Sequence, residues 1–472
     1  MKTNIRIGGG QNTYKINPLF KDIKEYNKYL LSLICIFILV LTGIISYNYT
    51  NTSYAKWNSS VESNNILKLS VKINPNAPKL TSNMIPVYYD ETNEVWKKAD
   101  STNKNNKWYD YDNKIWANAV TVTSTNRETY LNASVGTEIS MDDINTMWVW
   151  IPRYTYTYLN TNTPQEIQIK FESGTNSTGT IKCTDAVTGT SSTSETCTDS
   201  TNGSLIAGTS TYTHPAFTFG GTELTGIWVG KFEVSSGQII KPNVTSLRSQ
   251  TVYQFYTGIY NMRNSDNAFG FATTDETHMM KNMEWGAVAY LSHSKYGINK
   301  EIAINSANTF TTGCGPQSEG STSYGSTCNA YNTTLGQSAS TTGNVYGVYD
   351  MSGGAYEYVM GNMVNSSGAF YSSSSGFSTA PDAKYYDKYS YGTSNTEYTR
   401  GKLGDATKEM APTGTSGNWY SDYAVFPFSS RSWFIRGGRC YNGSFAGAFY
   451  FSGSLGGASG DSSSRTVISN LN

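Results

Sequence analysis

The sequence predicts an α+β protein in which one membrane-spanning helix and a small β-rich module precede a large domain with little regular secondary structure. Three observations predict this architecture. One apolar run without a charged residue lies near the beginning, at residues 29–47. Short segments rich in aromatic and β-branched residues, which favour strands, recur between turns of Gly, Asn and Asp. Beyond the apolar run, the clearest helical periodicity lies at residues 278–297.

The apolar run, YLLSLICIFILVLTGIISY, has 19 residues, and a helix needs about 20 to cross the hydrocarbon core of a bilayer. Because positive flanks stay in the cytoplasm, we expect a cytoplasmic tail at residues 1–28, a single-pass signal anchor in the cell membrane at residues 29–47, and an extracellular C-terminal domain. A signal peptide cleaved at Ala55 is the alternative. The flank carries more basic than acidic residues: Lys2, Arg6, Lys15, Lys21, Lys24 and Lys28 against Asp22 and Glu25.

The composition argues against nucleic acid as a partner. The chain has 35 basic and 35 acidic residues, so it lacks the net positive charge that such a partner requires. Tyrosine, with 36 residues, outnumbers both Phe (18) and Trp (10). Tyrosine suits binding surfaces and β-strands alike, and on composition alone the strand role is favoured.

The cysteines agree with export from the cytoplasm. Cys183 and Cys197 are 14 residues apart in a polar stretch, and Cys314 and Cys328 repeat that spacing in another. We expect two local disulfides, each closing a surface loop. A zinc site is the weaker interpretation, because no further Cys or His lies at the short spacing it needs. Cys440 remains as a single thiol.

Two segments separate the anchor from the large domain. Residues 48–80 are polar and contain Pro75 and Pro78, as a stalk or linker does. Residues 81–141 alternate aromatic segments with Asn, Lys and Asp turns, which predicts small hairpins. The tryptophans of this module could form a carbohydrate platform, but filling the core of a small sheet is the more frequent role. They are Trp96, Trp108 and Trp116.

The large domain is predicted over residues 142–472. Met147 to Tyr158 and Gly226 to Val234 read as strands, and the Thr/Ser-rich stretch between them as a grafted loop. His278 to Gly297 reads as a helix, with Gly297 suited to a left-handed stop. One face of this helix would carry Met280, Met283, Ala287 and Leu291.

Four segments resemble the formylglycine-generating enzyme, or sulfatase-modifying factor, family. They are GIWVGKFEV from Gly226, MEWGAVAYLSHSKYG from Met283, GNVYGVYDMSGGAYEYVMGN from Gly343 and FIRGGRCYNGSFAGAF from Phe434. The resemblance covers about Met147 to Val467. It implies that the large domain adopts the C-type lectin-like fold of that family. Fold does not fix function, so the site residues have to be considered separately.

One departure from the family's pattern indicates a non-catalytic member. Active relatives bind copper through two cysteines after the Arg-Gly-Gly strand, and soft copper(I) needs both thiolates. Here Cys440 is the only cysteine in that region. The family's calcium site corresponds to Glu357, but the neighbouring amide ligand of that site is absent here. The preferred interpretation of Glu357 is a carboxylate bonded to backbone amides within the fold, with no cofactor, and calcium is the alternative.

Other enzyme classes find no support in the sequence. The three histidines, His214, His278 and His293, do not have metal-ligand spacing, and we expect surface or structural roles for them. No phosphate-binding loop or nucleophile elbow is present.

The C-terminal stretch from Arg436 to Arg465 alternates aromatic and small polar residues with frequent glycine, the composition of a binding surface. In binding relatives of the fold, including targets of diversity-generating retroelements, this region displays the ligand-contacting side chains. The alternative is that half of the aromatics point inward, because neighbours in a strand face opposite sides. The predicted ligand-binding residues are Trp419, Tyr420, Trp433, Arg439, Tyr441, Asn442, Ser444, Phe445, Tyr450, Ser452 and Asp461.

The sequence therefore predicts a membrane-tethered receptor or adhesin that binds an extracellular protein or glycan. Its bias toward Asn, Lys, Tyr and Ile indicates a bacterium with an AT-rich genome. Two alternatives remain. One is an enzyme on the same fold, either an oxidoreductase using Cys440 or a hydrolase. The other is a structural subunit of an envelope or appendage that assembles through the aromatic module.

Overall fold

The computed structural model describes residues 57–61, 67–71, 74–103, 107–184, 195–412, 418–469 and 471. Within these ranges, no helix combines the length and apolarity needed to cross a bilayer. The predicted anchor at residues 29–47 lies outside them. Residues 55–472 form one compact unit, which contains the sheets and the core described below.

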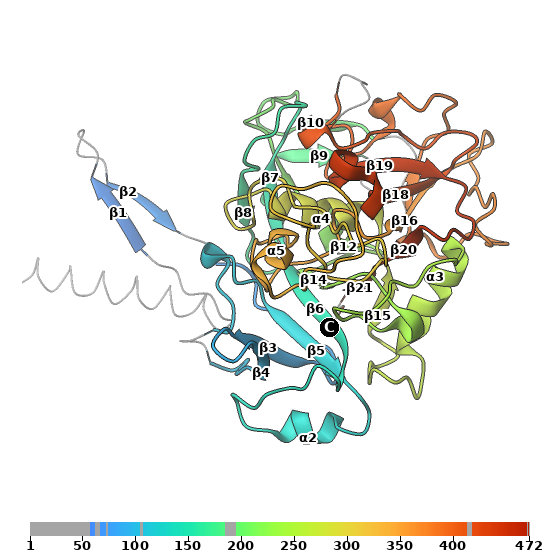
Figure 1. Ribbon diagram of the computed structural model, residues 1–472. Helices are drawn as coiled ribbons and strands as arrows, with labels where there is room; N and C mark the ends of the chain where they lie inside the picture. Colours follow the sequence, from blue (N-terminus) through green and yellow to red (C-terminus); the bar gives the residue numbers. More distant parts are fainter. Residues whose placement is uncertain are drawn as a thin grey trace, which may run out of the picture. The chain divides into compact units, whose positions relative to one another are not determined.

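The larger sheet is antiparallel and has seven strands (Figure 1). Its central strand, with the sequence INTMWVWIP, is rich in β-branched and aromatic residues and buried at all positions but one. In spatial order the strands are β15 (Glu276–Met279), β21 (Thr466–Ser469), β14 (Gly226–Gly230), β6 (Ile144–Pro152), β5 (Asn118–Val122), β3 (Ile85–Asp90) and β4 (Val95–Lys98).

The aromatic module shares this sheet with the large domain. The expected boundary between residues 141 and 142 falls between β5 and β6, which pair with each other over Asn118–Val122. Trp96 and Trp116 are buried, and the indole N–H of Trp116 donates to the Tyr296 carbonyl at 2.8 Å. These two tryptophans therefore fill the core and form no exposed platform.

The smaller sheet has five strands and is mixed. β16 pairs antiparallel with β18 on one side and parallel with β17 and β20 on the other, and β19 extends the sheet beyond β18. Only Arg465 separates β20 from β21, so the chain passes from one sheet to the other at this residue. The strands are β16 (Tyr356–Met363), β17 (Asp387–Tyr389), β18 (Trp433–Gly437), β19 (Gly447–Ser454) and β20 (Ser462–Ser464).

Helix α4 (Asn282–Ser292) is shorter than the predicted 278–297 and is buried at every residue. The prediction of a start at His278 was wrong, because residues 276–279 form β15 and pair with β21. The end was also misplaced: Gly297 does not have a positive φ, whereas Asn299 does, at 53°. A helix buried on all sides belongs to the centre of a domain, not to its surface.

The remaining elements are short, and the expectation of few helices is confirmed, although strands are more frequent than a domain with little regular secondary structure would contain. β1 and β2 form an antiparallel pair inside the predicted stalk. The helices are α2 (Arg127–Asn132), α3 (Val252–Tyr260) and α5 (Thr334–Ser338), and the strands are β1 (Trp57–Val61), β2 (Leu67–Val71), β7 (Tyr154–Thr157), β8 (Ile169–Phe171), β9 (Ile181–Cys183), β10 (Cys197–Asp199), β11 (Thr211–Thr213), β12 (Thr218–Phe219) and β13 (Thr222–Glu223).

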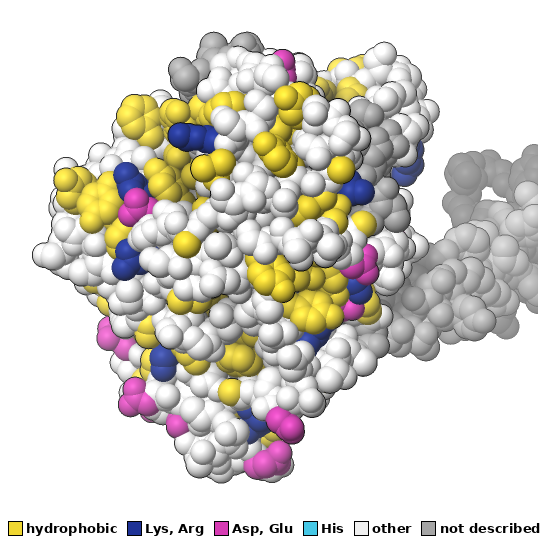
Figure 2. Space-filling view, turned by 90° about the vertical axis from the view of Figure 1, so that its right-hand side faces the viewer, with side chains coloured by type: hydrophobic (Ala, Val, Ile, Leu, Met, Phe, Trp, Pro, Cys, Tyr) yellow, Lys and Arg dark blue, Asp and Glu magenta, His cyan; other side chains and the backbone are white. Residues whose placement is uncertain are grey.

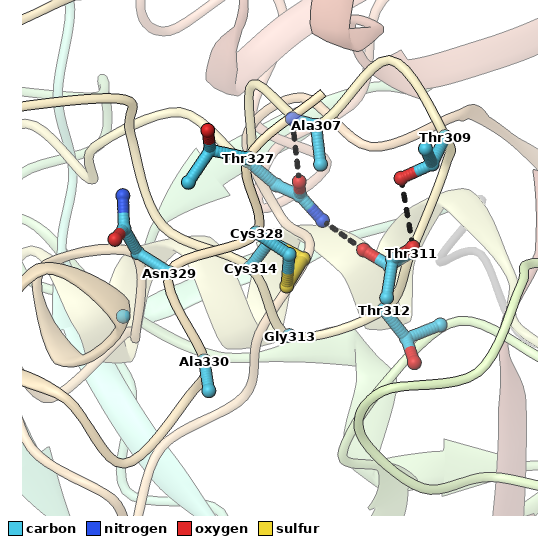
Figure 3. Close-up of a disulfide and its surroundings, with 12 residues drawn as sticks. Ala307, Thr309, Thr311, Thr312, Gly313, Cys314, Thr327, Cys328, Asn329 and Ala330 are labelled. Atoms are coloured by element: carbon cyan, nitrogen blue, oxygen red, sulfur yellow. Dashed lines mark hydrogen bonds between the residues drawn. A yellow bond between two sulfur atoms is a disulfide. The ribbon is translucent and has the colours of Figure 1, made fainter. Parts of the chain in front are cut away.

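Both predicted disulfides are confirmed. Cys183 and Cys197 join the paired strands β9 and β10. Cys314 and Cys328 close a second loop, beside which the Thr309 and Thr311 hydroxyls are hydrogen-bonded at 2.8 Å (Figure 3). Cys440 is free and buried. The spacing of 14 residues was therefore sufficient to assign the two pairs.

Candidate functional site

A groove of about 840 Å³ opens along the smaller sheet, beside β18 and β19. Residues from β16, β18 and β19 line it, together with the loop at residues 455–459 and a 3-10 turn at Cys440–Phe445. The groove volume lies in the range of ligand sites, which is about 300 to 1,000 Å³. Strands and a tight turn therefore supply part of its walls, and loops supply the rest.

The 3-10 turn follows directly from the Arg-Gly-Gly sequence. Gly437 and Gly438 have φ values of 80° and 74°, which glycine adopts without strain. A Cβ on Gly438 would also lie 2.8 Å from Ala446. Arg439 then begins the turn, and its backbone N–H donates to the Asn442 side-chain oxygen at 2.8 Å. The turn thus depends on these glycines and on Asn442.

Tyrosine rings form one wall of the groove. The Tyr450 ring lies with its centroid 5.7 Å from that of Tyr356 and 5.7 Å from that of Tyr423. Tyr450 itself is buried, whereas Tyr423 is 40% exposed and Phe445 is 56% exposed. Such rings offer contact area with few torsions to immobilise. The groove therefore has an aromatic wall, with Phe445 exposed beside it.

Four of the predicted ligand-binding residues line this groove: Asn442, Phe445, Tyr450 and Ser452. Trp419 and Trp433, by contrast, are fully buried. The Trp419 indole N–H donates to the Thr161 carbonyl at 2.7 Å, and the Trp433 ring stacks on Phe377 with centroids 5.8 Å apart. The structure corrects these two assignments, because both side chains point into the core.

The other predicted residues lie outside the lining. The Arg439 guanidinium pairs with Asp461 and lies 5.4 Å from the ring centroids of both Tyr356 and Tyr441. Tyr441 is 39% exposed, and Ser444 is exposed. Tyr420 is half-buried, with its ring stacked on Phe449. Arg439 thus connects the groove wall to Tyr441.

Sequence reasoning missed several lining residues. Tyr356 and Tyr358 alternate with buried Glu357 in β16, and both line the groove. Their period of two is visible in the sequence of the segment that begins at Gly343. Tyr423 and Arg431 line the groove from irregular segments, for which the sequence contains no periodic signal.

Glu357 is bonded within the fold. Arg465 Nε donates to Glu357 Oε2 at 3.0 Å, and Arg465 Nη2 donates to Oε1. Burial raises the pKa of the Glu357 carboxyl to about 7, although Arg465 acts in the opposite direction. The Arg465 guanidinium thus engages both carboxylate oxygens of Glu357. This geometry matches the preferred interpretation of an internally bonded carboxylate, with arginine as the donor in place of backbone amides.

Cys440 is in an environment that opposes thiol chemistry. Burial raises the pKa of its thiol to about 12, and the Glu233 carboxylate adds to this rise. Burial also raises the pKa of Glu233 well above its usual range, with contributions from Asp350 and Glu357. Because the thiolate is the nucleophile and metal ligand, a thiol held protonated does not favour the oxidoreductase alternative.

All three histidines are buried, which fits structural roles. Burial lowers the pKa of His214 to about 3 and that of His293 to about 4. His278 Nε2 lies 2.9 Å from Glu284 Oε1. In the described part of the chain, one cluster has the composition of a metal site, Cys183, Glu195 and Cys197, and two of its members share a disulfide.

No family model matches the chain, and no curated protein is significantly similar to it. The chemistry of the site must therefore be judged from its geometry. The right-hand side of the molecule in Figure 1 is largely uncharged and polar, with hydrophobic side chains gathered in patches (Figure 2). Arg431 contributes the single ionisable cation among the residues that line the groove. An arrangement of rings and hydroxyls such as this is suited to binding by contact and hydrogen bonds.

Proposed function

We propose that this protein is a non-catalytic surface receptor or adhesin, anchored in the membrane by residues 29–47, that binds an extracellular protein or glycan in the groove beside β18 and β19. The observation that carries the proposal is the convergence of Asn442, Phe445, Tyr450 and Ser452 on one groove. The sequence predicts these four residues as part of a binding surface. Their location in one groove supports that prediction.

The chemistry of the groove supports binding over catalysis. Hydroxyl groups from Ser421, Ser452 and Ser462 accompany the tyrosine rings, and these groups hydrogen-bond a ligand without activating it. The nearby Cys440 thiol has a raised pKa, as described above. The resemblance of the four motifs to the sulfatase-modifying factor family, without its pair of copper cysteines, points the same way.

The proposal can be tested with purified residues 55–472, which form one compact unit. Binding would be screened on a glycan array and on host and bacterial cell surfaces. Phe445→Ala and Tyr423→Ala each remove an exposed ring. Loss of an aromatic anchor costs about 1–3 kcal/mol, so each variant should bind about 5- to 150-fold more weakly.

Val135→Ala is the matched control. Val135 is 58% exposed and lies between α2 and β6, away from the groove lining. Its variant should bind as the wild type does. A ligand whose affinity is the same for the wild type and for both ring variants would refute the site assignment. Polymerisation of the purified protein with rising concentration would favour the structural-subunit alternative.

A further inference from the structure

Arg431 is the cation of the groove beside β18 and β19, and it is exposed there. Its guanidinium has no hydrogen-bond, ion-pair or ring partner among the residues that the structure describes. Its backbone, by contrast, is held in a turn: the Arg431 N–H donates to the Phe428 carbonyl at 2.6 Å, and the Phe428 N–H donates to the Arg431 carbonyl at 3.1 Å. A hydrogen-bonded turn therefore presents an unpaired positive charge to the groove.

No carboxylate balances this charge, because none of the described residues that line the groove is Asp or Glu. Asp422 is adjacent in sequence to two lining residues, but it is 1% exposed, and its Oδ2 accepts the Phe449 N–H at 2.9 Å. Burial also raises the pKa of the Asp422 carboxyl well above its usual range, which favours the neutral form. Asp461 pairs with Arg439. The groove is thus positively charged and complementary to an anion.

Asn442 adds a second unpaired donor to the lining. Its side-chain oxygen accepts the Arg439 N–H at 2.8 Å, whereas its amide N–H groups have no partner among the described residues. Guanidinium and amide N–H groups donate hydrogen bonds and do not accept them, so the ligand has to supply acceptors. A carboxylate is the planar acceptor that matches a guanidinium, because it accepts two parallel hydrogen bonds.

The strands that line the groove have their edges paired, which disfavours a peptide. β16 and β18 each have a strand on both sides. The outer edge of β19 is occupied at Phe451, whose N–H donates to the Tyr423 carbonyl at 3.0 Å and whose carbonyl accepts the Val425 N–H at 3.0 Å. Many peptide ligands bind by adding a strand to a free edge. These pairings oppose that mode of binding here.

The side chains of the groove suit a sugar better than an apolar peptide anchor. The large aliphatic residues of the lining are Ile435, which is buried, and Leu455, which is exposed. A peptide helix docks its apolar face into a hydrophobic groove, which these two residues do not provide. Exposed rings at Tyr423 and Phe445 offer flat faces to the C–H groups of a sugar. Five serines of the lining can exchange hydrogen bonds with sugar hydroxyls.

We propose that the ligand is an acidic glycan, in which a sugar carboxylate pairs with Arg431 while sugar rings pack on Tyr423 and Phe445. The inference rests on the proposed function, because it names the ligand class of the same groove. The positive charge selects the carboxylate, and the rings and hydroxyls bind the sugar that carries it. A neutral glycan leaves the guanidinium without an anionic partner, so it binds more weakly.

The test measures binding of the full chain to matched pairs of oligosaccharides. One member of each pair ends in a sialic acid or a uronic acid, and in the other member the carboxylate is reduced to an alcohol. The acidic member should bind about fivefold more tightly at low ionic strength, which is the upper range for an exposed ion pair. The preference should decrease in 1 M salt, where the Debye length falls to about 3 Å.

Two variants assign the preference to Arg431. Arg431→Gln removes the positive charge and should reduce the preference for the acidic member to about onefold. Because Arg431 is exposed and its side chain has no partner in the described fold, this substitution should leave the urea midpoint of unfolding unchanged. Lys170→Gln is the matched control: it removes an exposed positive charge of β8 outside the lining and should retain the preference.

The outcomes are distinguishable. A preference for the acidic member that is lost in Arg431→Gln and kept in Lys170→Gln supports the inference. A glycan that binds equally well with and without its carboxylate overturns it, as does a protein ligand that binds through Phe445 while no glycan binds. In both of these cases the proposed function of the groove survives. Absence of any ligand, in this assay and in the screens of glycans and cell surfaces, would refute the proposed function together with the inference.

Discussion

Glu409 is a buried carboxyl whose replacement should change how stability depends on pH. Its Oε2 accepts hydrogen bonds from the Tyr156 hydroxyl at 2.8 Å, the Tyr290 hydroxyl at 2.8 Å and the Gly404 backbone N–H at 2.7 Å. Its Oε1 accepts one from the Leu159 N–H at 3.2 Å. All four donors are neutral. Burial therefore prevails over these bonds and raises the pKa of Glu409 to about 7.

The direction of the effect follows from proton linkage. The native carboxyl binds a proton more tightly than the unfolded one, whose pKa is 4.5. Stability from this group is full below the unfolded pKa and is lost as the pH rises from about 4.5 to about 7. One pKa unit corresponds to about 1.4 kcal/mol, so the total loss is about 3 kcal/mol. Glu409→Gln removes the titration and should avoid this loss.

The wild type alone cannot isolate this effect, because His214 and His293 titrate in the opposite sense. Their pKa values in the native protein lie below the unfolded value of 6.5, so their contribution to the free energy of unfolding is lost as the pH falls. The difference between Glu409→Gln and the wild type cancels the histidines. Urea unfolding of residues 55–472 should show the variant gaining about 3 kcal/mol relative to the wild type between about pH 5 and about pH 8.

Glu128→Gln, which changes an exposed glutamate of α2, is the matched control. Its stability relative to the wild type should change by less than about 0.5 kcal/mol over the same range. The reasoning would be refuted if the stability difference between Glu409→Gln and the wild type were the same at both pH values, or if the variant lost stability relative to the wild type as the pH rose.

Three further predictions concern the frame and the anchor. Gly286→Ala would place a Cβ 1.9 Å from the Gly404 carbonyl oxygen, so it should lower the free energy of unfolding in urea by about 1–3 kcal/mol. Gly460→Ala is the control and should be neutral, because no atom lies within 4 Å of the added Cβ. Replacing Cys314 and Cys328 by Ser should cost about 3 kcal/mol, and an unchanged midpoint would contradict this. The full chain should sediment with membranes and lose this property when residues 29–47 are deleted; a mature N-terminus immediately after Ala55 would instead establish cleavage.

The sequence predicted features that depend on local spacing better than those that depend on distant pairing. The two disulfides followed from cysteines 14 residues apart. The start of α4 did not follow, because His278 belongs to a strand that pairs with Val467, far along the chain. The pairing of β5 with β6 in one sheet was not predicted, for a related reason. Residues 81–141 differ in composition from the rest of the chain, but composition does not indicate which strands pair.

The candidate site was predicted in part, for a reason that β18 makes clear. Alternation of inward and outward residues applies to a strand with one face in solvent. β18 is buried at all five positions, so Trp433 had no outward face to occupy. The 3-10 turn contributed the exposed groove residue Phe445, because its side chain extends from a turn and not from a strand. The alternation of side chains along a strand therefore could not predict that Trp433 is buried and Phe445 exposed.

The hydrogen bonds of the 3-10 turn indicate which residues of the site can be substituted. Two backbone hydrogen bonds connect the turn to the rest of the fold: the Cys440 N–H donates to the Gly354 carbonyl at 2.9 Å, and the Tyr423 N–H donates to the Phe445 carbonyl at 3.0 Å. These bonds join backbone atoms, so they do not involve the side chains of Tyr441, Ser444 and Phe445, all three of which are exposed.

Buried residues on either side of the turn have no such freedom. Arg436 donates to the carbonyls of Asp405 and Ala406, and Arg465 pairs with Glu357 where the chain passes between the sheets. Removing one partner of a buried pair costs about 3–5 kcal/mol. Sister copies of this protein that bind different ligands should therefore differ at Tyr441, Ser444 and Phe445 and retain both arginines. Variation concentrated at the arginines would contradict a binding role for the turn.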